Sequence, residues 1–363
     1  MKIIYTLFIT AFISLSSYCQ PQAWLEQNSG VTVQLTSVSV SGQGIAVWIC
    51  GYNGTVLRTT NSGNNWINVS GNGIPSTVLL VNTLGIGNNT ALTAGYIGST
   101  TYVYRTSNAG ANWTQVFTQA NGFINAIVSV NQSTTNLFMQ GDPVDGRWSL
   151  WRTTNGGVNW DSSGLYLPQA GAEAGWNNSM FSVLNGTMIW FGTNNSRIYY
   201  STNGGLLWTS QSTAPEANSY AVWFFNFLGY SEGLMGGATL MRTSNYGSNW
   251  TPMASLGTGN FGGISGAQYP VDNPAFHILW YVRGNNNIYF SYSGGQNWQV
   301  EHTAPAGNYR HLNGRSYSNG PWYAVRTNGG ISYHGIISGI QPVSNESPGE
   351  FNLYQNYPNP FNP

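Results

Sequence analysis

An eight-residue pattern occurs six times along the 363-residue chain, at intervals of 42 to 48 residues. It begins with Ser or Thr, has a small polar residue third and Gly fifth, and ends in Trp, as in "TTNSGNNW" (Thr59–Trp66). A period of a few tens of residues indicates a chain built from repeated supersecondary units. The six boxes carry, at these three positions, Asn61, Gly63 and Trp66; Asn108, Gly110 and Trp113; Asn155, Gly157 and Trp160; Asn203, Gly205 and Trp208; Asn245, Gly247 and Trp250; and Ser293, Gly295 and Trp298.

The segments between the boxes have the composition of short strands. Before each box, two runs rich in Val, Ile, Tyr, Phe and Trp are separated by Gly or Asn, as in "MIWFGTNNSRIYYST". After each box, a variable segment leads to a further apolar run, and no amphipathic helix of useful length is indicated. About four strands in roughly 45 residues is the spacing of a propeller blade, so the sequence predicts an all-β propeller.

The two ends of the repeat region predict how many blades there are. Beyond Trp298 the chain offers three more strand candidates and no further box, whereas "AWLEQNSGVTVQLTSVSV" near the N-terminus opens with Trp24, 42 residues before Trp66. We therefore expect the Trp24 strand to complete the last blade and close a seven-bladed ring. Closure removes exposed sheet edges and the need for capping repeats.

The box resembles the Asp box (bacterial neuraminidase repeat) of the sialidase-like propeller superfamily, in which Asp stands where this chain has Asn or Ser. Within that superfamily the blades resemble the photosystem II assembly and stability factor type. In physical terms the box is a tight turn: the third side chain bonds its own backbone, Gly takes a positive φ, and Trp packs the hairpin onto the blade. Its presence in every blade favours a structural role, and the resemblance implies a fold but no activity.

An arginine precedes four of the boxes at the same repeat position: Arg58, Arg105, Arg152 and Arg242. A residue type shared among blades is expected to be a packing or turn partner. The alternative is that these side chains point to one face and form an anion-binding ring.

The first 19 residues are predicted to be a secretory signal, with Lys2 as its charged start and Ile3–Ile13 as its apolar stretch. Cleavage is expected after Cys19; the alternative is a lipoprotein in which Cys19 is kept and acylated. No later segment is long and apolar enough to span a membrane. We expect a secreted or cell-surface protein with its propeller at residues 20–337.

The C-terminal string "FNLYQNYPNPFNP" (residues 351–363) resembles the first strand and turn of the type A sorting domain of the type IX secretion system. The resemblance implies a truncated β-sandwich domain, export across the outer membrane of a Bacteroidota-like bacterium, and the type IX machinery as a partner. Residues 338–350 are polar, contain Pro and Gly, and are predicted to be the linker.

Composition narrows the range of partners. Charged residues make up 6% of the chain, the formal net charge is zero, and Lys2 is the only lysine, which argues against nucleic acid and anionic lipid as ligands. We expect no metal or other cofactor, because no His or Cys has metal-ligand spacing with another; the histidines are His277, His302, His311 and His334. If Cys19 is removed, Cys50 is the only thiol, and its apolar surroundings predict a buried small side chain.

Four of the eleven acidic residues lie in the third blade, where the repeat is irregular: Asp142, Asp145, Asp161 and Glu173. "GDPVDGRW" (Gly141–Trp148) replaces a tight turn, and the next connection is longer. Some bacterial members of the superfamily carry a similar segment followed by Glu. Asp142 and Glu173 are thus candidate acid/base residues or metal ligands, with Arg147 and Asp145 as candidate binding residues. The alternative is a purely structural turn capped by Glu173.

Two main functions follow. The first is an exported, non-catalytic propeller that binds a glycan or protein ligand; the second is a glycoside hydrolase or lyase using the third blade, which requires carboxylates about 5–10 Å apart on a common cleft. A structural surface adhesin is a third possibility. Additional aromatic residues are mostly expected in the core, while exposed ones are candidates for stacking on sugars or peptides: Trp176, Trp190, Trp223, Trp280 and Trp322.

Overall fold

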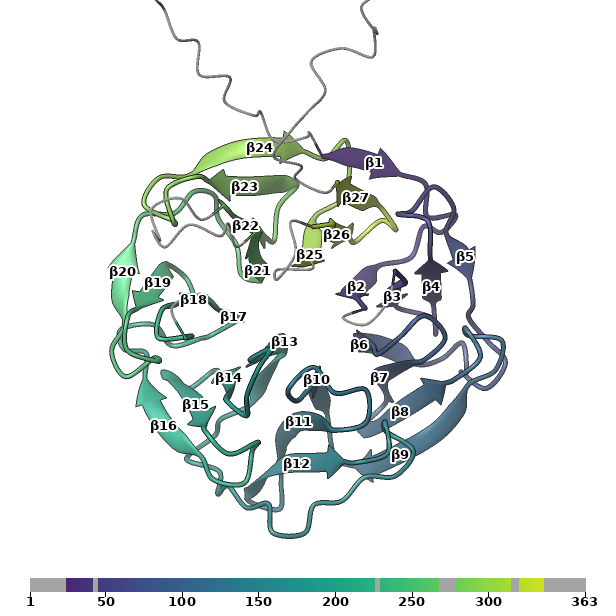
Figure 1. Cartoon of the computed structure of the whole chain (residues 1–363), viewed down its shortest axis with the longest axis horizontal. Coiled ribbons are helices and arrows are strands. Elements are labelled where there is room, and N and C mark those ends of the chain that lie inside the picture. Colours follow the sequence, from purple (N-terminus) through teal and green to yellow (C-terminus); the bar gives the residue numbers. More distant parts are fainter. Residues whose placement is uncertain (1–23, 42–44, 226–228, 268–277, 315–319, 336–363) are drawn as a thin grey trace, which may run out of the picture. The chain divides into compact units, whose positions relative to one another are not determined.

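The computed structural model describes residues 24–41, 45–225, 229–267, 278–314 and 320–335. Over these residues it consists of strands, turns and loops without a helix, arranged as seven antiparallel sheets around a central axis (Figure 1). The predicted seven-bladed propeller is confirmed. The expected signal peptide, Cys19, His277, the linker and the sorting segment lie outside the described residues.

Each blade begins with its innermost strand and continues outwards. The strands are, for blade one, β2 (Leu35–Val40), β3 (Val47–Gly51), β4 (Val56–Thr59) and β5 (Ile67–Asn68); blade two, β6 (Leu79–Gly85), β7 (Ala91–Ile97), β8 (Thr100–Thr106) and β9 (Thr114–Ala120); blade three, β10 (Ile124–Ser129), β11 (Leu137–Val144) and β12 (Arg147–Thr153); blade four, β13 (Gly175–Ser182), β14 (Ile189–Thr193), β15 (Arg197–Ser201) and β16 (Thr209–Ser212); blade five, β17 (Ala221–Phe224), β18 (Gly233–Gly236), β19 (Leu240–Thr243) and β20 (Thr251–Met253); blade six, β21 (Phe261–Ala267), β22 (Ile278–Arg283), β23 (Asn287–Ser291) and β24 (Gln299–Thr303); and blade seven, β25 (Tyr309–Gly314), β26 (Trp322–Arg326), β27 (Ile331–His334) and β1 (Leu25–Gln27).

The core lies between the blades. Middle strands such as β22 are buried along their whole length, whereas outer strands such as β5 are exposed. Apolar clusters join neighbouring blades, because each twisted sheet packs its inner positions against the next sheet. Trp190, Trp223, Trp280 and Trp322 are buried as expected, and Cys50 is a fully buried free thiol whose pKa burial raises to about 11.

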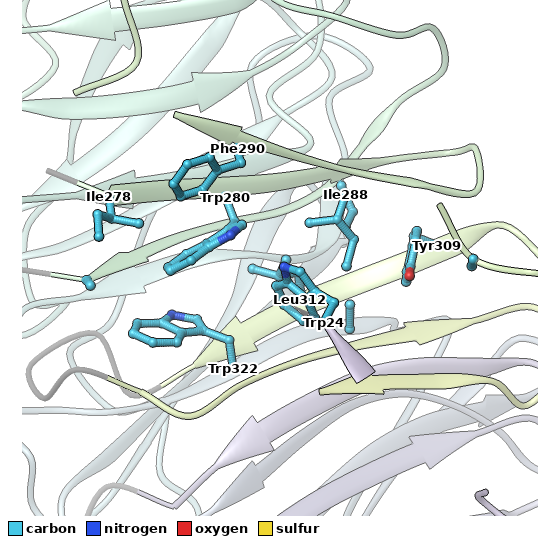
Figure 2. Close-up of a cluster of buried hydrophobic side chains, with 12 residues drawn as sticks. Trp24, Ile278, Trp280, Ile288, Phe290, Tyr309, Leu312 and Trp322 are labelled. Atoms are coloured by element: carbon cyan, nitrogen blue, oxygen red, sulfur yellow. The ribbon is translucent and has the colours of Figure 1, made fainter. Parts of the chain in front are cut away.

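The N-terminal strand closes the ring, as the spacing of Trp24 predicts. β1 pairs antiparallel with β27, with Glu26 opposite Ser332. Trp24 is 4% exposed and meets Trp280 edge-on with ring centroids 6.3 Å apart. Figure 2 shows Trp24 among the side chains of blades six and seven.

Glu26 fastens this strand to blade seven. Its carboxylate accepts hydrogen bonds from the Arg326 guanidinium, from Ser332 Oγ at 2.7 Å and from the His302 ring at 2.8 Å. Burial alone would raise the pKa of Glu26, but these partners lower it to about 2. The closing strand is therefore held by charge as well as by backbone pairing.

Glu301 lies at the same seam. Its Oε2 accepts hydrogen bonds from Trp24 Nε1 at 2.7 Å and from Trp280 Nε1 at 2.6 Å. Burial raises the pKa of Glu301 to about 7, although both hydrogen bonds and the nearby His302 act in the opposite direction. Ionising Glu301 therefore costs stability in the folded protein.

Glu301→Gln is expected to stabilise the protein at neutral and alkaline pH. The pKa of Glu301 in the folded protein lies above the ordinary glutamate value of 4.5, so the native protein loses stability as pH rises from about 4.5 through about 7. Glutamine keeps an acceptor oxygen and does not ionise. The difference in unfolding free energy between the variant and wild type should grow by on the order of 3 kcal/mol in favour of the variant as pH rises from about 4.5 to about 8. Urea denaturation of both proteins measures this difference, and a pH-independent difference would contradict it.

The boxes form the same turn each time. In the first box, Thr59 Oγ1 accepts a hydrogen bond from Gly63 N at 3.0 Å, and Asn61 Oδ1 accepts one from Asn65 N at 3.1 Å. Asn or Ser makes the same contacts in the other five boxes. The six boxes thus share one hydrogen-bonded turn.

Two of the box tryptophans also donate hydrogen bonds to the preceding blade. Trp66 Nε1 donates to Gln27 Oε1 at 3.0 Å on blade seven, and Trp113 Nε1 donates to the Val69 carbonyl at 2.9 Å on blade one. These two side chains thus join a hairpin to the preceding blade, whereas Trp298 packs on Tyr281 of its own blade.

The fourth box gives a sharp test of turn geometry. Gly204 and Gly205 both have positive φ, at 70° and 86°, but a Cβ on Gly204 would meet open space whereas one on Gly205 would overlap the Phe138 ring of blade three. Gly204→Ala should cost about 1 kcal/mol of folding free energy, and Gly205→Ala about 3 kcal/mol. Chemical denaturation compares the unfolding free energies of the two variants. Equal losses of stability would show that Gly205 does not pack tightly against Phe138.

Blade three departs from the four-strand expectation. Beyond β12 no fourth strand forms, and only two isolated bridges remain, Arg147 with Pro168 and Arg152 with Asp161. The chain between the bridges turns at Ser162–Leu165 and buries Leu165 in the core. The long connection after Trp160 thus replaces the regular outer strand by a loop packed on the blade.

The arginines before the boxes contact turns. Arg58 donates to the Asn88 carbonyl at 2.8 Å and Arg105 to the Gly156 carbonyl at 2.7 Å, both on the next blade. Arg242 likewise reaches the Gly294 carbonyl at 3.2 Å, while Arg152 bonds the Ser163 carbonyl at 3.2 Å in its own blade. They are turn and packing partners, and the alternative of an anion-binding ring is not what the structure shows.

Candidate functional site

Glu173 of the irregular blade is enclosed by structural contacts. It is 2% exposed, and its Oε1 accepts hydrogen bonds from Tyr199 Oη at 2.7 Å, from Ala170 N at 2.8 Å and from Trp148 Nε1 at 2.9 Å. Its Oε2 lies 3.6 Å from Arg197 Nε. The carboxylate therefore holds the 168–174 loop against blades three and four, and it does not face an open cleft.

Asp142 holds the same loop from another side. Its Oδ1 accepts hydrogen bonds from Asn125 Nδ2 at 2.7 Å and from Gly175 N at 2.8 Å. Burial raises the pKa of Asp142, against the effect of these two donors. Both candidate acid/base residues are thus engaged with the backbone that leads into β13.

The other candidates of this blade lie at exposed positions. Asp145 is exposed with φ at 54° in the turn between β11 and β12, and Arg147 is exposed beside it. Asp161 is exposed and caps Ser163 N at 2.9 Å. In the described part of the chain, no cluster of three or more His, Cys, Asp or Glu side chains could hold a metal ion.

The central channel contains the larger cavities. One, of about 250 Å³, is lined mainly by residues before or early in the innermost strands, together with Tyr52 and Tyr96 at the ends of the neighbouring strands β3 and β7. It is here called the strand-start cavity. A second cavity, of about 240 Å³, is lined mainly by residues that lie later along the innermost strands or just after them, such as Val40, Leu184 and Gly314. The innermost strands therefore begin at one mouth of the ring and end at the other.

Asn178 forms part of the wall between these cavities, since it lines both. Its Oδ1 accepts hydrogen bonds from Ser37 Oγ and Asn82 Nδ2, both at 2.8 Å, and its Nδ2 lies 3.3 Å from the Thr36 carbonyl. These bonds join blade four to blades one and two. Asn178 has φ at 63°, a conformation that Asn tolerates better than most residues.

The strand-start cavity is rich in aromatic side chains. Tyr52, Tyr96, Trp176 and Tyr220 come from blades one, two, four and five, and each is half-buried. Trp176 packs on Tyr220 with ring centroids 4.5 Å apart, and Phe123 of blade three backs Tyr96 at 4.8 Å. Burial raises the pKa of Tyr96, with Tyr52 adding to the effect.

Polar groups complete the lining. Gln34, Asn177 and Asn260 supply amides, and Arg310 of β25 supplies an exposed guanidinium. Of the lining residues only Arg310 is charged. The arrangement can pack apolar or planar groups, hydrogen-bond a backbone and attract an anion, but it contains no carboxylate for general acid/base chemistry.

Sequence reasoning identified only Trp176 among these residues. Tyr52 and Tyr96 stand in matching strings of the first two blades, "GYNG" (Gly51–Gly54) and "GYIG" (Gly95–Gly98), and this signal was missed. Tyr220 and Arg310 come from other blades and have no such match. The available signal is their position, because all lie near the start of an innermost strand or at the end of the strand beside it.

Comparisons with known proteins support the fold. A family model described as photosynthesis system II assembly factor YCF48 matches residues 18–150. No curated protein has significant sequence similarity to the chain. In the part of the chain that the structure describes, no helix is long and apolar enough to cross a membrane.

Two solved structures have the same fold. "YCF48 bound to D1 peptide" is 16% identical with a TM-score of 0.62, covering 87% of this chain and 97% of that one. "YCF48 from Cyanidioschyzon merolae" is 15% identical with a TM-score of 0.64, covering 86% and 98%. This chain is thus similar to YCF48 in its seven-bladed fold, and in sequence over its first blades.

Proposed function

We propose that this protein is an exported, non-catalytic propeller that binds an extended segment of a partner protein in the strand-start cavity. The observation that carries the proposal is the group of four half-buried aromatic side chains, from four blades, around one cavity. Rigid aromatic side chains give large contact areas at low entropic cost. A cavity of about 250 Å³ suits one or two side chains of a peptide whose remainder lies on the rim.

The comparison with YCF48 supports this class of ligand. One similar propeller is described as bound to a D1 peptide, so a propeller of this fold can take a peptide. The hydrolase alternative has less support, because Glu173 is enclosed and Asp142 bonds backbone. A glycan ligand remains the competing outcome of the binding experiment.

The test is binding of the purified propeller to an array of random pentapeptides, compared with a glycan array. Wild-type protein is expected to bind a subset of the peptides. Trp176→Ala and Tyr96→Ala should weaken that binding at least tenfold, since aromatic residues dominate such interfaces. Tyr166→Ala, which removes a side chain that is 65% exposed and outside the cavity, should leave it unchanged.

Circular dichroism melting of each variant separates lost binding from lost folding. Glycan binding without peptide binding would overturn the proposal. So would peptide binding that survives both cavity variants.

Export is the second part of the proposal. It rests on the signal-like residues 1–19 and on the sorting-like string at residues 351–363. N-terminal sequencing of the protein recovered from outside the producing cells should begin at Gln20. An acylated Cys19 would favour the lipoprotein alternative, and retention in the cytoplasm would contradict export.

A further inference from the structure

Arg310 stands apart from most arginines of the ring. Those at positions 58, 105, 152, 197, 242, 283 and 326 each have a carbonyl, carboxylate or hydroxyl partner for the guanidinium. Within the described ranges, the Arg310 side chain has neither a hydrogen bond nor an ion pair, and only Arg147 shares this property. Arg147 lines only a small pocket of about 20 Å³ beside Trp148 and Trp151, whereas Arg310 lines the strand-start cavity of about 250 Å³.

The charge of the cavity indicates the chemistry of its ligand. Arg310 contributes a positive charge, and no Asp or Glu occurs among the lining residues. A guanidinium matches a carboxylate with two parallel hydrogen bonds, which give the pair both strength and a defined geometry. Carboxylate side chains, which are strong acceptors for sugar hydroxyls, are missing from the lining, and this favours a peptide over a neutral glycan.

The amides that line the same cavity suit a peptide backbone. Asn177 and Asn260 are exposed at the cavity, and each side chain offers both a donor and an acceptor. Tyr52 and Tyr96, on blades one and two, supply planar surface for a neighbouring side chain. The lining thus combines one cation, several amides and aromatic faces.

We propose that the strand-start cavity selects peptide segments that carry a carboxylate, and that Arg310 binds this group. The inference rests on the proposed peptide-binding function and adds the chemical class of the peptide. The carboxylate comes either from an Asp or Glu side chain or from a free C-terminus, which present the same chemistry to the guanidinium.

The experiment uses three sets of pentapeptides on one array. The first has an internal Asp or Glu and an amidated C-terminus, the second has no acidic residue and a free C-terminus, and the third has neither. Wild-type protein should bind the first or the second set at least tenfold better than the third. Which of the two binds identifies the source of the carboxylate.

Variants of Arg310 connect the selectivity to the cavity. Arg310→Gln should lose at least tenfold in binding, Arg310→Lys should retain part of it, and added salt should weaken wild-type binding. The exposed Arg147 of blade three provides the comparison, because Arg147→Gln changes the same side chain outside the cavity. Loss of binding in Arg147→Gln but not in Arg310→Gln would place the site on blade three and overturn the inference.

Different results would overturn the proposed peptide binding and the proposed selection of a carboxylate. Equal binding to all three peptide sets, or full binding by Arg310→Gln, overturns the carboxylate inference and leaves peptide binding standing. No binding to any peptide set overturns both.

Discussion

Glu173→Ala is expected to lower the free energy of unfolding by about 4 kcal/mol. The carboxylate is buried and accepts hydrogen bonds from Trp148, Tyr199 and Ala170 N, with Arg197 3.6 Å away. Removing one member of a buried charged network leaves its partners desolvated and unpaired, which is much costlier than losing a surface contact. Urea denaturation with a two-state analysis measures the loss.

Two further variants of the same blade test this account. Glu173→Gln keeps the acceptor oxygen and should cost roughly half as much as Glu173→Ala, whereas Asp145→Ala changes an exposed turn residue and should cost less than about 1 kcal/mol. If Glu173→Ala unfolds at the wild-type urea concentration, the carboxylate is not structural. The hydrolase alternative would then regain its main candidate residue.

Trp24→Ala is expected to be about as damaging, at about 4 kcal/mol. The indole fills the seam between blades six and seven, meets His334 with ring centroids 5.4 Å apart, and donates to Glu301 (Figure 2). Truncating a buried aromatic side chain costs about 3–5 kcal/mol through lost transfer energy and the cavity that remains. The half-buried Glu301 carboxylate would also lose one of its two donors.

Leu25→Ala is the control for ring closure, because Leu25 is the next residue along the chain and is 51% exposed. It should change the free energy of unfolding by less than about 1 kcal/mol. Equal effects of Trp24→Ala and Leu25→Ala would contradict closure of the ring by the N-terminal strand.

The fold could be predicted because the turn in each repeat requires particular residue types. A positive φ at Gly63 and a backbone-bonding side chain at Asn61 leave few substitutes, so the box recurs and its spacing reveals the blades. The closing strand was predictable from Trp24 by the same spacing. The lost outer strand of blade three was not, because whether the loop after Trp160 pairs with β12 depends on the burial of Leu165 in three dimensions.

The candidate site was harder to predict for a physical reason. Asp142 and Glu173 drew notice because acidic residues are scarce, yet scarcity does not distinguish a catalytic carboxylate from one that accepts hydrogen bonds in the core. The strand-start cavity is assembled from side chains such as Tyr52 and Arg310, which lie far apart in sequence and line the same cavity only in the closed ring. Such positions become visible only after the blades are placed.

Hydrogen–deuterium exchange of the propeller, with and without a peptide selected from the array, tests the central claim most directly. Binding in the strand-start cavity predicts slower exchange at the starts of the innermost strands, around Thr36, Asn177 and Phe261. Slower exchange confined to the box turns, or to the Asp145–Arg147 turn of blade three, would contradict it and place the binding surface elsewhere on the ring.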